Sequence, residues 1–92
     1  MIVKVRFRGP IAARMSSDIY EIKADNNATL NDVLINLIRE HEEVRDVWTS
    51  SEQMDRDTLL LRNDADIGLF DGLETKLDDG DELIILPLVH GG

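Results

Sequence analysis

An unbroken apolar run near the end of the chain, Leu83 to Leu86, most constrains the fold. A strand that is apolar on both faces is usually central in its sheet and often parallel to a neighbour. The run follows a tight turn at residues 78–81 and stops at Pro87, which has no N–H for a sheet ladder. We therefore expect this strand to lie in the middle of a sheet.

Other segments supply the remaining strands. Residues 2–7 alternate between apolar and basic side chains, with Val3, Val5 and Phe7 on one face, which indicates a half-buried strand. Gly9-Pro10 breaks it. We expect a second strand over residues 18–24, a third over 58–62, and a short edge strand at Ile67 and Leu69.

The sequence contains one strongly predicted helix. Thr29 is a favourable N-cap, and Asp32 three residues later nearly completes a capping box. Apolar residues then recur at helical spacing: Leu30, Val33, Leu34, Leu37 and Ile38. Val44 and Val47 predict a further short helical turn, and Trp48 is expected to cover the core. Residues 50–57 are polar and are expected to form a mobile loop.

This order of elements predicts an α+β fold of the β-grasp (ubiquitin-like) type, a mixed sheet packed on one main helix. The first and last strands are the most apolar, so we expect them side by side. A parallel pair needs a long crossover, which the intervening helix provides. Residues 1–87 form the predicted domain, and residues 88–92 form an extended tail ending in Gly-Gly.

Composition excludes several classes of function. The 92 residues contain no cysteine, which excludes disulfides and thiolate zinc sites and fits a reducing, cytoplasmic location. No signal peptide is visible, and no apolar run approaches the roughly 20 residues of a membrane span. A net charge of −9 argues against nucleic-acid binding. The acidity favours a partner with a basic docking surface, or serves solubility alone.

The chain shows no catalytic or cofactor motif of its own. Its carboxylates lie mostly in predicted turns and on the helix surface, where a perturbed catalytic pair is not expected. His41 and His90 are too few for a typical structural zinc site. Gly68 and Gly72 do not fit a phosphate-binding loop. We therefore expect no stably bound cofactor and no active site within this chain.

The last third of the chain resembles the MoaD/ThiS family of sulfur carriers and their archaeal ubiquitin-like modifier relatives, the SAMP group. The resemblance rests on the segment 77–87, then Val89 and the final Gly91-Gly92, and on residues 29–34 at the helix start. Two positions depart from the family pattern. Leu88 replaces a second proline that many molybdopterin-synthase small subunits have, and His90 replaces their usual alanine.

The resemblance implies a chemical role for the chain end. An activating enzyme of the MoeB/ThiF type would use ATP to adenylate the Gly92 carboxylate. Gly91 and His90 would thread a narrow channel of that enzyme, where glycine has conformational freedom that other residues lack. Pro87, Leu88 and Val89 would dock on the partner. His90 would either hydrogen-bond within the channel or remain solvated.

Three functions follow as alternatives. Sulfur attack on the adenylate would give a Gly92 thiocarboxylate that delivers sulfur in molybdopterin biosynthesis, with a molybdopterin synthase large subunit as partner, or in tRNA thiolation. Attack by a lysine of a target protein would give an isopeptide bond. The third alternative is an interaction domain without tail chemistry. The acidic segment 78–82 is either an ordinary turn or a contact for a basic patch.

Overall fold

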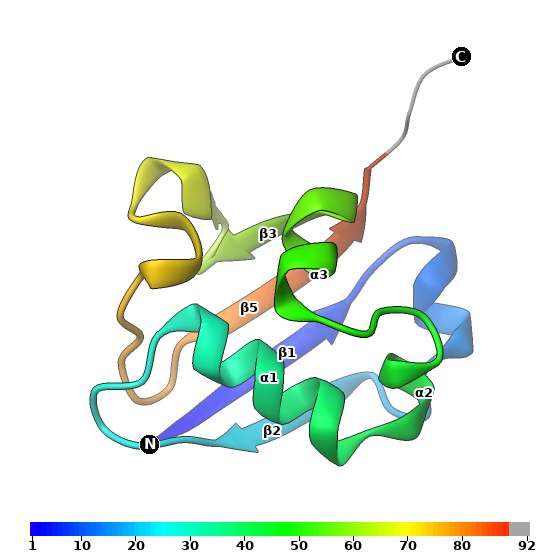
Figure 1. Cartoon of the computed structure of the whole chain (residues 1–92), viewed down its shortest axis with the longest axis horizontal. Helices are drawn as coiled ribbons and strands as arrows, with labels where there is room; N and C mark the ends of the chain where they lie inside the picture. The colour runs from blue at the N-terminus through cyan, green and yellow to red at the C-terminus, as the bar shows by residue number, and fades with distance from the viewer. Residues whose placement is uncertain (89–92) are drawn as a thin grey trace.

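The computed structural model describes residues 1–88. They form a five-stranded sheet in the order β2-β1-β5-β3-β4, with helices packed on one face (Figure 1). The strands are β1 Ile2–Phe7, β2 Ile19–Lys23, β3 Thr58–Arg62, β4 Ala65–Asp66 and β5 Glu82–Pro87. This is the β-grasp arrangement that the sequence predicts.

β1 and β5 lie side by side at the centre of the sheet. They pair in parallel, with Val5 opposite Leu83, while β2 and β3 flank them in antiparallel pairing. The alternation in β1 is as predicted: Val3 and Val5 are buried on the helix side and Lys4 is exposed on the other. The apolar run of β5 is thus the central strand, as expected.

The main helix, α1, spans Leu30–Glu40 and begins with the predicted capping box. The Asp32 amide donates to Thr29 Oγ1 at 3.3 Å, and the Thr29 amide donates to Asp32 Oδ2 at 3.0 Å. These bonds satisfy two amides at the helix start that have no partner within the helix. The predicted apolar stripe is buried along the whole helix: Leu30, Val33, Leu34, Leu37 and Ile38.

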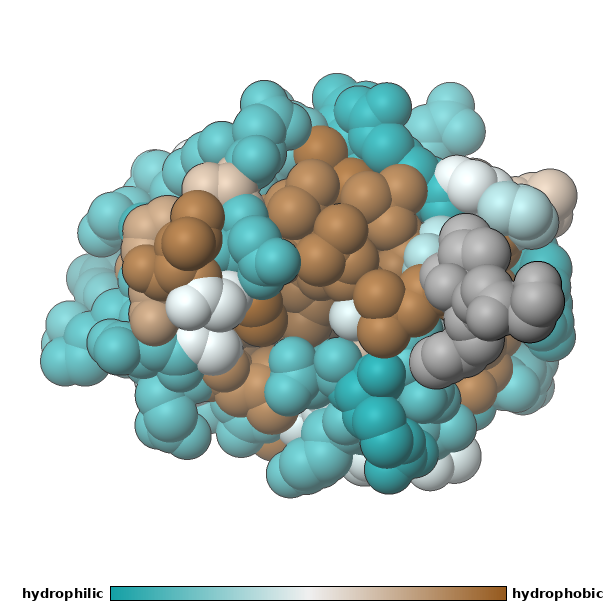
Figure 2. Space-filling view, turned by 90° about the horizontal axis from the view of Figure 1, so that it is seen from above, coloured by the Kyte–Doolittle hydropathy of each residue, from teal (hydrophilic) through white to brown (hydrophobic). Residues whose placement is uncertain are grey.

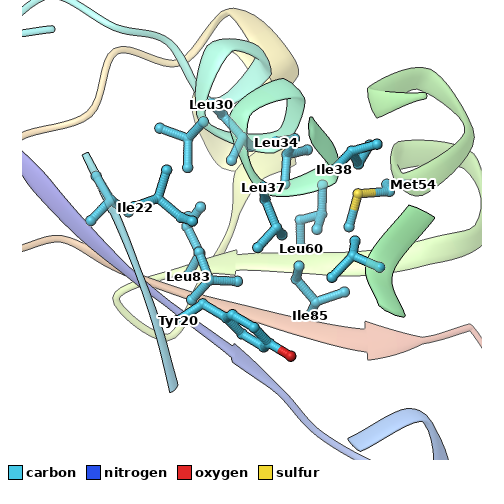
Figure 3. Close-up of a cluster of buried hydrophobic side chains, with 14 of the residues drawn as sticks. Tyr20, Ile22, Leu30, Leu34, Leu37, Ile38, Met54, Leu60, Leu83 and Ile85 are labelled. Atoms are coloured by element: carbon cyan, nitrogen blue, oxygen red, sulfur yellow. The ribbon is translucent and has the colours of Figure 1, made fainter. Parts of the chain in front are cut away.

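The core lies between α1 and the sheet, where Leu34 and Leu37 approach Leu83 and Ile85 (Figure 3). An aromatic cluster closes one end of the core. Phe7 and Trp48 stack with ring centroids 5.9 Å apart and planes 10° from parallel. Trp48 is only 5% exposed, so the prediction that it covers the core is confirmed.

The short helix α2, Glu42–Arg45, is the helical turn predicted around Val44. Tyr20 of β2 donates a hydrogen bond to Glu43 Oε2 at 2.9 Å, and Ser16 donates to the same oxygen. The bond from Ser16, reinforced by that from Tyr20, lowers the pKa of Glu43 to about 2. These bonds join α2 to β2 and to the loop before it.

The prediction of a mobile loop at residues 50–57 is wrong. Ser51–Asp57 is a helix, α3, and the Gln53 amide donates to Ser50 Oγ at 3.1 Å at its N-cap. Met54 is fully buried under this helix. Only Ser51 and Met54 of α3 are buried, and a single apolar residue gives no helical periodicity in the sequence.

The predicted edge strand at Ile67 and Leu69 is also wrong. The edge strand β4 is Ala65–Asp66, and a 3₁₀ helix, η2 (Ile67–Leu69), follows it. Asp66 begins η2 by accepting a bond from the Gly68 amide at 2.8 Å. Leu69 is 80% exposed, so it anchors nothing in the described domain.

Two further 3₁₀ helices complete the described chain, η1 (Pro10–Arg14) and η3 (Gly72–Glu74). No helix in residues 1–88 is long and apolar enough to cross a membrane. His41 is half-buried at the end of α1, where the centroid of its ring lies 4.5 Å from that of Tyr20.

Candidate functional site

The end of β5 carries the first residues of the predicted tail site. Pro87 is half-buried and pairs with Thr58 of β3. Leu88 is 40% exposed, and its amide donates to Asp57 O at 3.2 Å. The other predicted site residues, Val89, His90, Gly91 and Gly92, lie outside the described residues. Their roles, and the division of the chain into a domain of 1–87 and a tail of 88–92, stay predictions.

The loop after β1 contacts Pro87. The Arg8 amide donates to Ile85 O at 3.0 Å, which continues the β1–β5 ladder. Gly9 then turns the chain with φ of 79°, a conformation that side chains other than glycine's rarely adopt. A Cβ on Gly9 would lie 3.3 Å from Pro87 Cδ. The backbone of Gly9 and the ring of Pro87 are therefore in close contact.

The sheet face opposite the helices is apolar over β3 and β5. The strand register places Leu59 beside Leu86 and Leu61 beside Ile84 on this face. Ile84 is buried, but the three leucines keep part of their surface exposed. Figure 2, which views the β3 side of the molecule, shows hydrophobic surface gathered in one area with hydrophilic residues around it. We call Leu59, Leu61, Ile84 and Leu86 the open-face patch.

Basic side chains border the open-face patch along β1. Lys4 and Arg6 alternate with the buried valines, and Arg8 continues the row beyond the strand. Arg6 Nε lies 3.2 Å from Glu82 Oε1, and both side chains are about one-third exposed. The border therefore mixes these cations with the carboxylates of Glu21 and Glu82, which the strand register places on either side of Lys4, although the whole chain carries −9. The net charge does not describe this face.

The other end of β5 is held by a buried polar network. Asp81 is 7% exposed and accepts bonds from Arg62 Nε at 2.9 Å, Asn63 Nδ2 at 3.0 Å and the Asp78 amide at 2.8 Å. Burial alone would raise the pKa of Asp81, but these hydrogen bonds and the Arg62 charge outweigh it and lower the pKa. Asp81 is thus committed inside the domain.

This network bears on the acidic segment 78–82. β5 has six residues, so its two ends are roughly 17 Å apart at about 3.3 Å per residue. The acidic turn therefore lies at the opposite end of the strand from Pro87 and Leu88. The carboxylate of Asp81 has a structural role, which favours the interpretation of the segment as a turn.

Metal binding finds no support in the described part of the chain. Residues 1–88 contain no group of three or more His, Asp or Glu side chains placed to hold a metal ion. The described residues instead place the end of β5 beside the open-face patch, with basic side chains along the β1 side of that patch. Such an arrangement suits docking on another protein.

Comparison with known proteins identifies the family. The model of the ThiS family matches residues 15–92. The chain belongs to this family. Its members are small ubiquitin-like carrier or modifier proteins rather than enzymes, as the sequence predicts.

Three of the proteins that the chain is similar to illustrate the range of the family. Small archaeal modifier protein 3 of Haloferax volcanii is 31% identical over 70 residues, which cover 76% of each chain. A solved complex holds subunits 1 and 2 of the molybdopterin-converting factor of Helicobacter pylori. The matched chain of that complex is 32% identical to this chain, the match covers 100% of each of these two chains, and the TM-score is 0.63. The crystal structure of SAMP1 from Haloferax volcanii has a TM-score of 0.79 at 22% identity over 100% of both chains, and shows the shared fold.

Sequence reasoning missed several parts of this site. The Gly9–Pro87 contact joins residues far apart in the chain, and only the parallel pairing of β1 and β5 brings them together. The basic border was visible in the alternation of residues 2–7, since Lys4 and Arg6 were assigned to one face. The role of these basic side chains depends on their lying next to β5. The net charge of the whole chain gives no information on that neighbour.

Proposed function

We propose that this chain is a sulfur carrier whose reactive group is the carboxylate of Gly92. A MoeB/ThiF-type enzyme activates that carboxylate with ATP, and the resulting thiocarboxylate delivers sulfur in molybdopterin biosynthesis or tRNA thiolation. The observation that carries the proposal is the family match, which extends to residue 92 and so includes the Gly-Gly end. The chain itself binds no cofactor stably in this account.

The chemistry has two steps. A carboxylate oxygen of Gly92 attacks the α-phosphorus of ATP and displaces pyrophosphate, which forms an acyl-adenylate. Hydrosulfide then attacks the carbonyl carbon and expels AMP, and loss of the remaining S–H proton leaves a thiocarboxylate. The carboxylate needs this activation because AMP is a far better leaving group than an oxide. The partner supplies the nucleotide site and the catalytic groups.

The geometry of the described residues supports this role. β5 is the central strand and is hydrogen-bonded on both sides, so Leu88 follows directly on a rigid base. Pro87 rests on Gly9, and Leu88 is partly exposed. A rigid base limits the conformational entropy lost when the following residues enter a partner's active site.

The open-face patch gives the partner a docking surface. Leu59, Leu61 and Leu86 supply an apolar centre, and Arg6 and Arg8 lie on its border. We expect the partner to present apolar side chains to this patch, with charges of both signs around them.

Intact mass spectrometry of the protein purified from its native cell tests the proposal. A carrier shows a species in which one oxygen is replaced by one sulfur, and deletion of Gly91 and Gly92 removes that species. Gly72→Asn is a matched control, since it changes a glycine with φ of 57° that has no atom of another residue near its Cβ position. A wild-type chain that never gains sulfur would contradict the carrier role.

The second candidate is a protein modifier joined through Gly92 to lysines of target proteins. The similarity to small archaeal modifier protein 3 favours it. The same adenylate serves both routes, and only the nucleophile differs. Because Lys76 is the last Lys or Arg before the end, trypsin would leave residues 77–92 as the remnant on a modified lysine. Such remnants on other proteins, absent from cells that express the chain without Gly91 and Gly92, would establish conjugation.

A further inference from the structure

The hydrogen bond between Leu88 and Asp57 continues the sheet beyond the end of β5. Thr58 faces Pro87 in the antiparallel ladder of β3 and β5, so the next facing pair is Asp57 and Leu88. The Leu88 amide donates to Asp57 O at 3.2 Å. Asp57 is the last residue of α3, which Figure 1 shows beside the end of β5. The end of α3 therefore holds the chain one residue past Pro87.

On its other side, β5 is released one residue earlier. The N–H groups along a strand point alternately to its two neighbours. The Arg8 amide donates to Ile85 O at 3.0 Å, and this is the last bond from the β1 side that the described residues form. Pro87 is the next residue to face that side, and it has no N–H to donate. Leu88 is therefore held by one neighbour only, through a single N–H.

Position 88 separates this bond from the contact of the side chain. The donor is the backbone N–H, which every residue except proline has. The Leu88 side chain is 40% exposed. Residues two apart in a strand share a face, so Leu88 continues the face of Leu86 and of the open-face patch. Proline at this position would remove the bond, whereas alanine would keep the bond and remove most of the side chain.

The bond also determines where the free tail begins. In the function proposed above, the reacting carbon belongs to Gly92, four residues past Leu88. Four extended residues span about 13–14 Å, at roughly 3.3–3.6 Å each. If the bond opened, the tail would begin at Pro87 and would gain one residue, about 3.5 Å. A net backbone hydrogen bond corresponds to a factor of about five in an equilibrium, so opening has a measurable cost.

We propose, on the basis of that function, that the Leu88–Asp57 bond is kept in the complex with the activating enzyme and limits the reach of the tail. The chain then fits an enzyme whose bound nucleotide lies within about 14 Å of Leu88. A deeper active site requires the bond to open first, which lowers activation about fivefold. Leu88 is thus a positioning residue, which acts through its N–H and does not touch the reacting atoms.

Leu88→Pro and a shortened tail test this role together. Adenylation of the chain by its MoeB/ThiF-type enzyme is measured as kcat/KM. Deletion of His90 shortens the tail by one residue and leaves Val89 next to Leu88. We expect it to lower kcat/KM about fivefold, because the bond must then open.

The effect of Leu88→Pro should change sign between the two chains. In the full-length chain it lowers kcat/KM about two- to fivefold, because the tail loses its fixed starting point and more conformational entropy is lost on binding. In the chain without His90 it raises kcat/KM about fivefold, because no bond has to open. Leu88→Ala is the matched control and lowers kcat/KM in both chains, since it keeps the N–H.

Hydrogen exchange of the Leu88 amide tests the bond without any enzyme. In the free wild type this amide should exchange about fivefold more slowly than in an unstructured peptide of the same sequence. Thermal unfolding checks that each variant is folded. An unprotected Leu88 amide, or a fall of kcat/KM with Leu88→Pro in both chains, overturns the role of Leu88 and leaves the proposed function in place. A wild type that is never adenylated overturns both.

Discussion

The two ends of β5 differ in how they are held. At its start, Asp81 is buried and bonded to Arg62, Asn63 and the Asp78 backbone. At its end, one backbone bond from Leu88 to Asp57 and the contact of Pro87 with Gly9 hold the chain, and Leu88 is 40% exposed. One strand therefore joins an anchored end to an end that faces a partner.

The difference explains how a small domain can present a reactive chain end. When a partner binds the residues after β5, the hydrogen bonds of Asp81 at the other end keep this strand in its place in the sheet. Parallel pairing with β1 and antiparallel pairing with β3 also hold β5 along its length. Stability should therefore depend mainly on the start of β5, and partner binding mainly on its end.

The largest stability effect is expected at the anchored end. Asp81→Ala leaves Arg62 and Asn63 without their buried acceptor and should destabilise the domain by about 2–3 kcal/mol. For a chain of this size each kcal/mol lowers Tm by roughly 4–8 °C. Thermal unfolding measures the loss. An unchanged Tm would show that the network does not anchor the strand.

A smaller stability effect is expected where Gly9 supports Pro87. Gly9→Ala adds strain at positive φ and a Cβ 3.3 Å from Pro87 Cδ, and should cost about 1–2 kcal/mol. Gly72→Ala is the matched control, because its φ is also positive but no atom lies within 4 Å of its Cβ position. Urea unfolding compares the two. Equal losses would mean that the contact with Pro87 contributes nothing.

At the open end we expect a loss of binding without a loss of stability. Leu88→Asp places a charge where an apolar side chain is 40% exposed, and should weaken binding to the activating enzyme about tenfold. Stability should stay within about 0.5 kcal/mol of the wild type. Ile35→Asp, on the exposed side of α1, is the control for binding. Similar weakening by both variants would argue against docking at the end of β5.

The smallest effect is a dependence of stability on acid. Hydrogen bonds and Arg62 hold the pKa of Asp81 below its ordinary value, so the folded state releases this proton more readily than the unfolded state. This contribution is complete above pH of about 4 and is lost as the pH falls through the lower, folded pKa. Urea unfolding at pH 6 and pH 3 should show a larger loss for wild type than for Asp81→Asn. Equal losses would contradict the assignment.

The sequence predicted those parts of the fold whose pattern is local. The capping box at Thr29 and the alternation in residues 2–7 depend on neighbours a few residues away, and both were confirmed. The parallel pairing of the first and last strands followed from the doubly apolar run of β5. The helix α3 was missed because only Met54 and Ser51 are buried, too few to give a period.

The positions of two candidate site residues could be predicted from the sequence, while their docking role stays a prediction. Pro87 and Leu88 follow directly from the end of β5, and the structure places them at the edge of an apolar face. The contact between Gly9 and Pro87 and the basic border of Arg6 and Arg8 depend on strand order, which composition averages away. A net charge describes the whole molecule, whereas a docking face is decided by the few residues on it.

The most direct test of the account is activation of the chain end. The full chain is incubated with ATP and a MoeB/ThiF-type enzyme from the same cell, and the products are examined by mass spectrometry. We predict an adenylate on Gly92 in the wild type and in Asp81→Asn below its unfolding temperature, and none after deletion of Gly91 and Gly92. Adenylate formation by the deleted chain, or at a residue other than the last, would contradict the account.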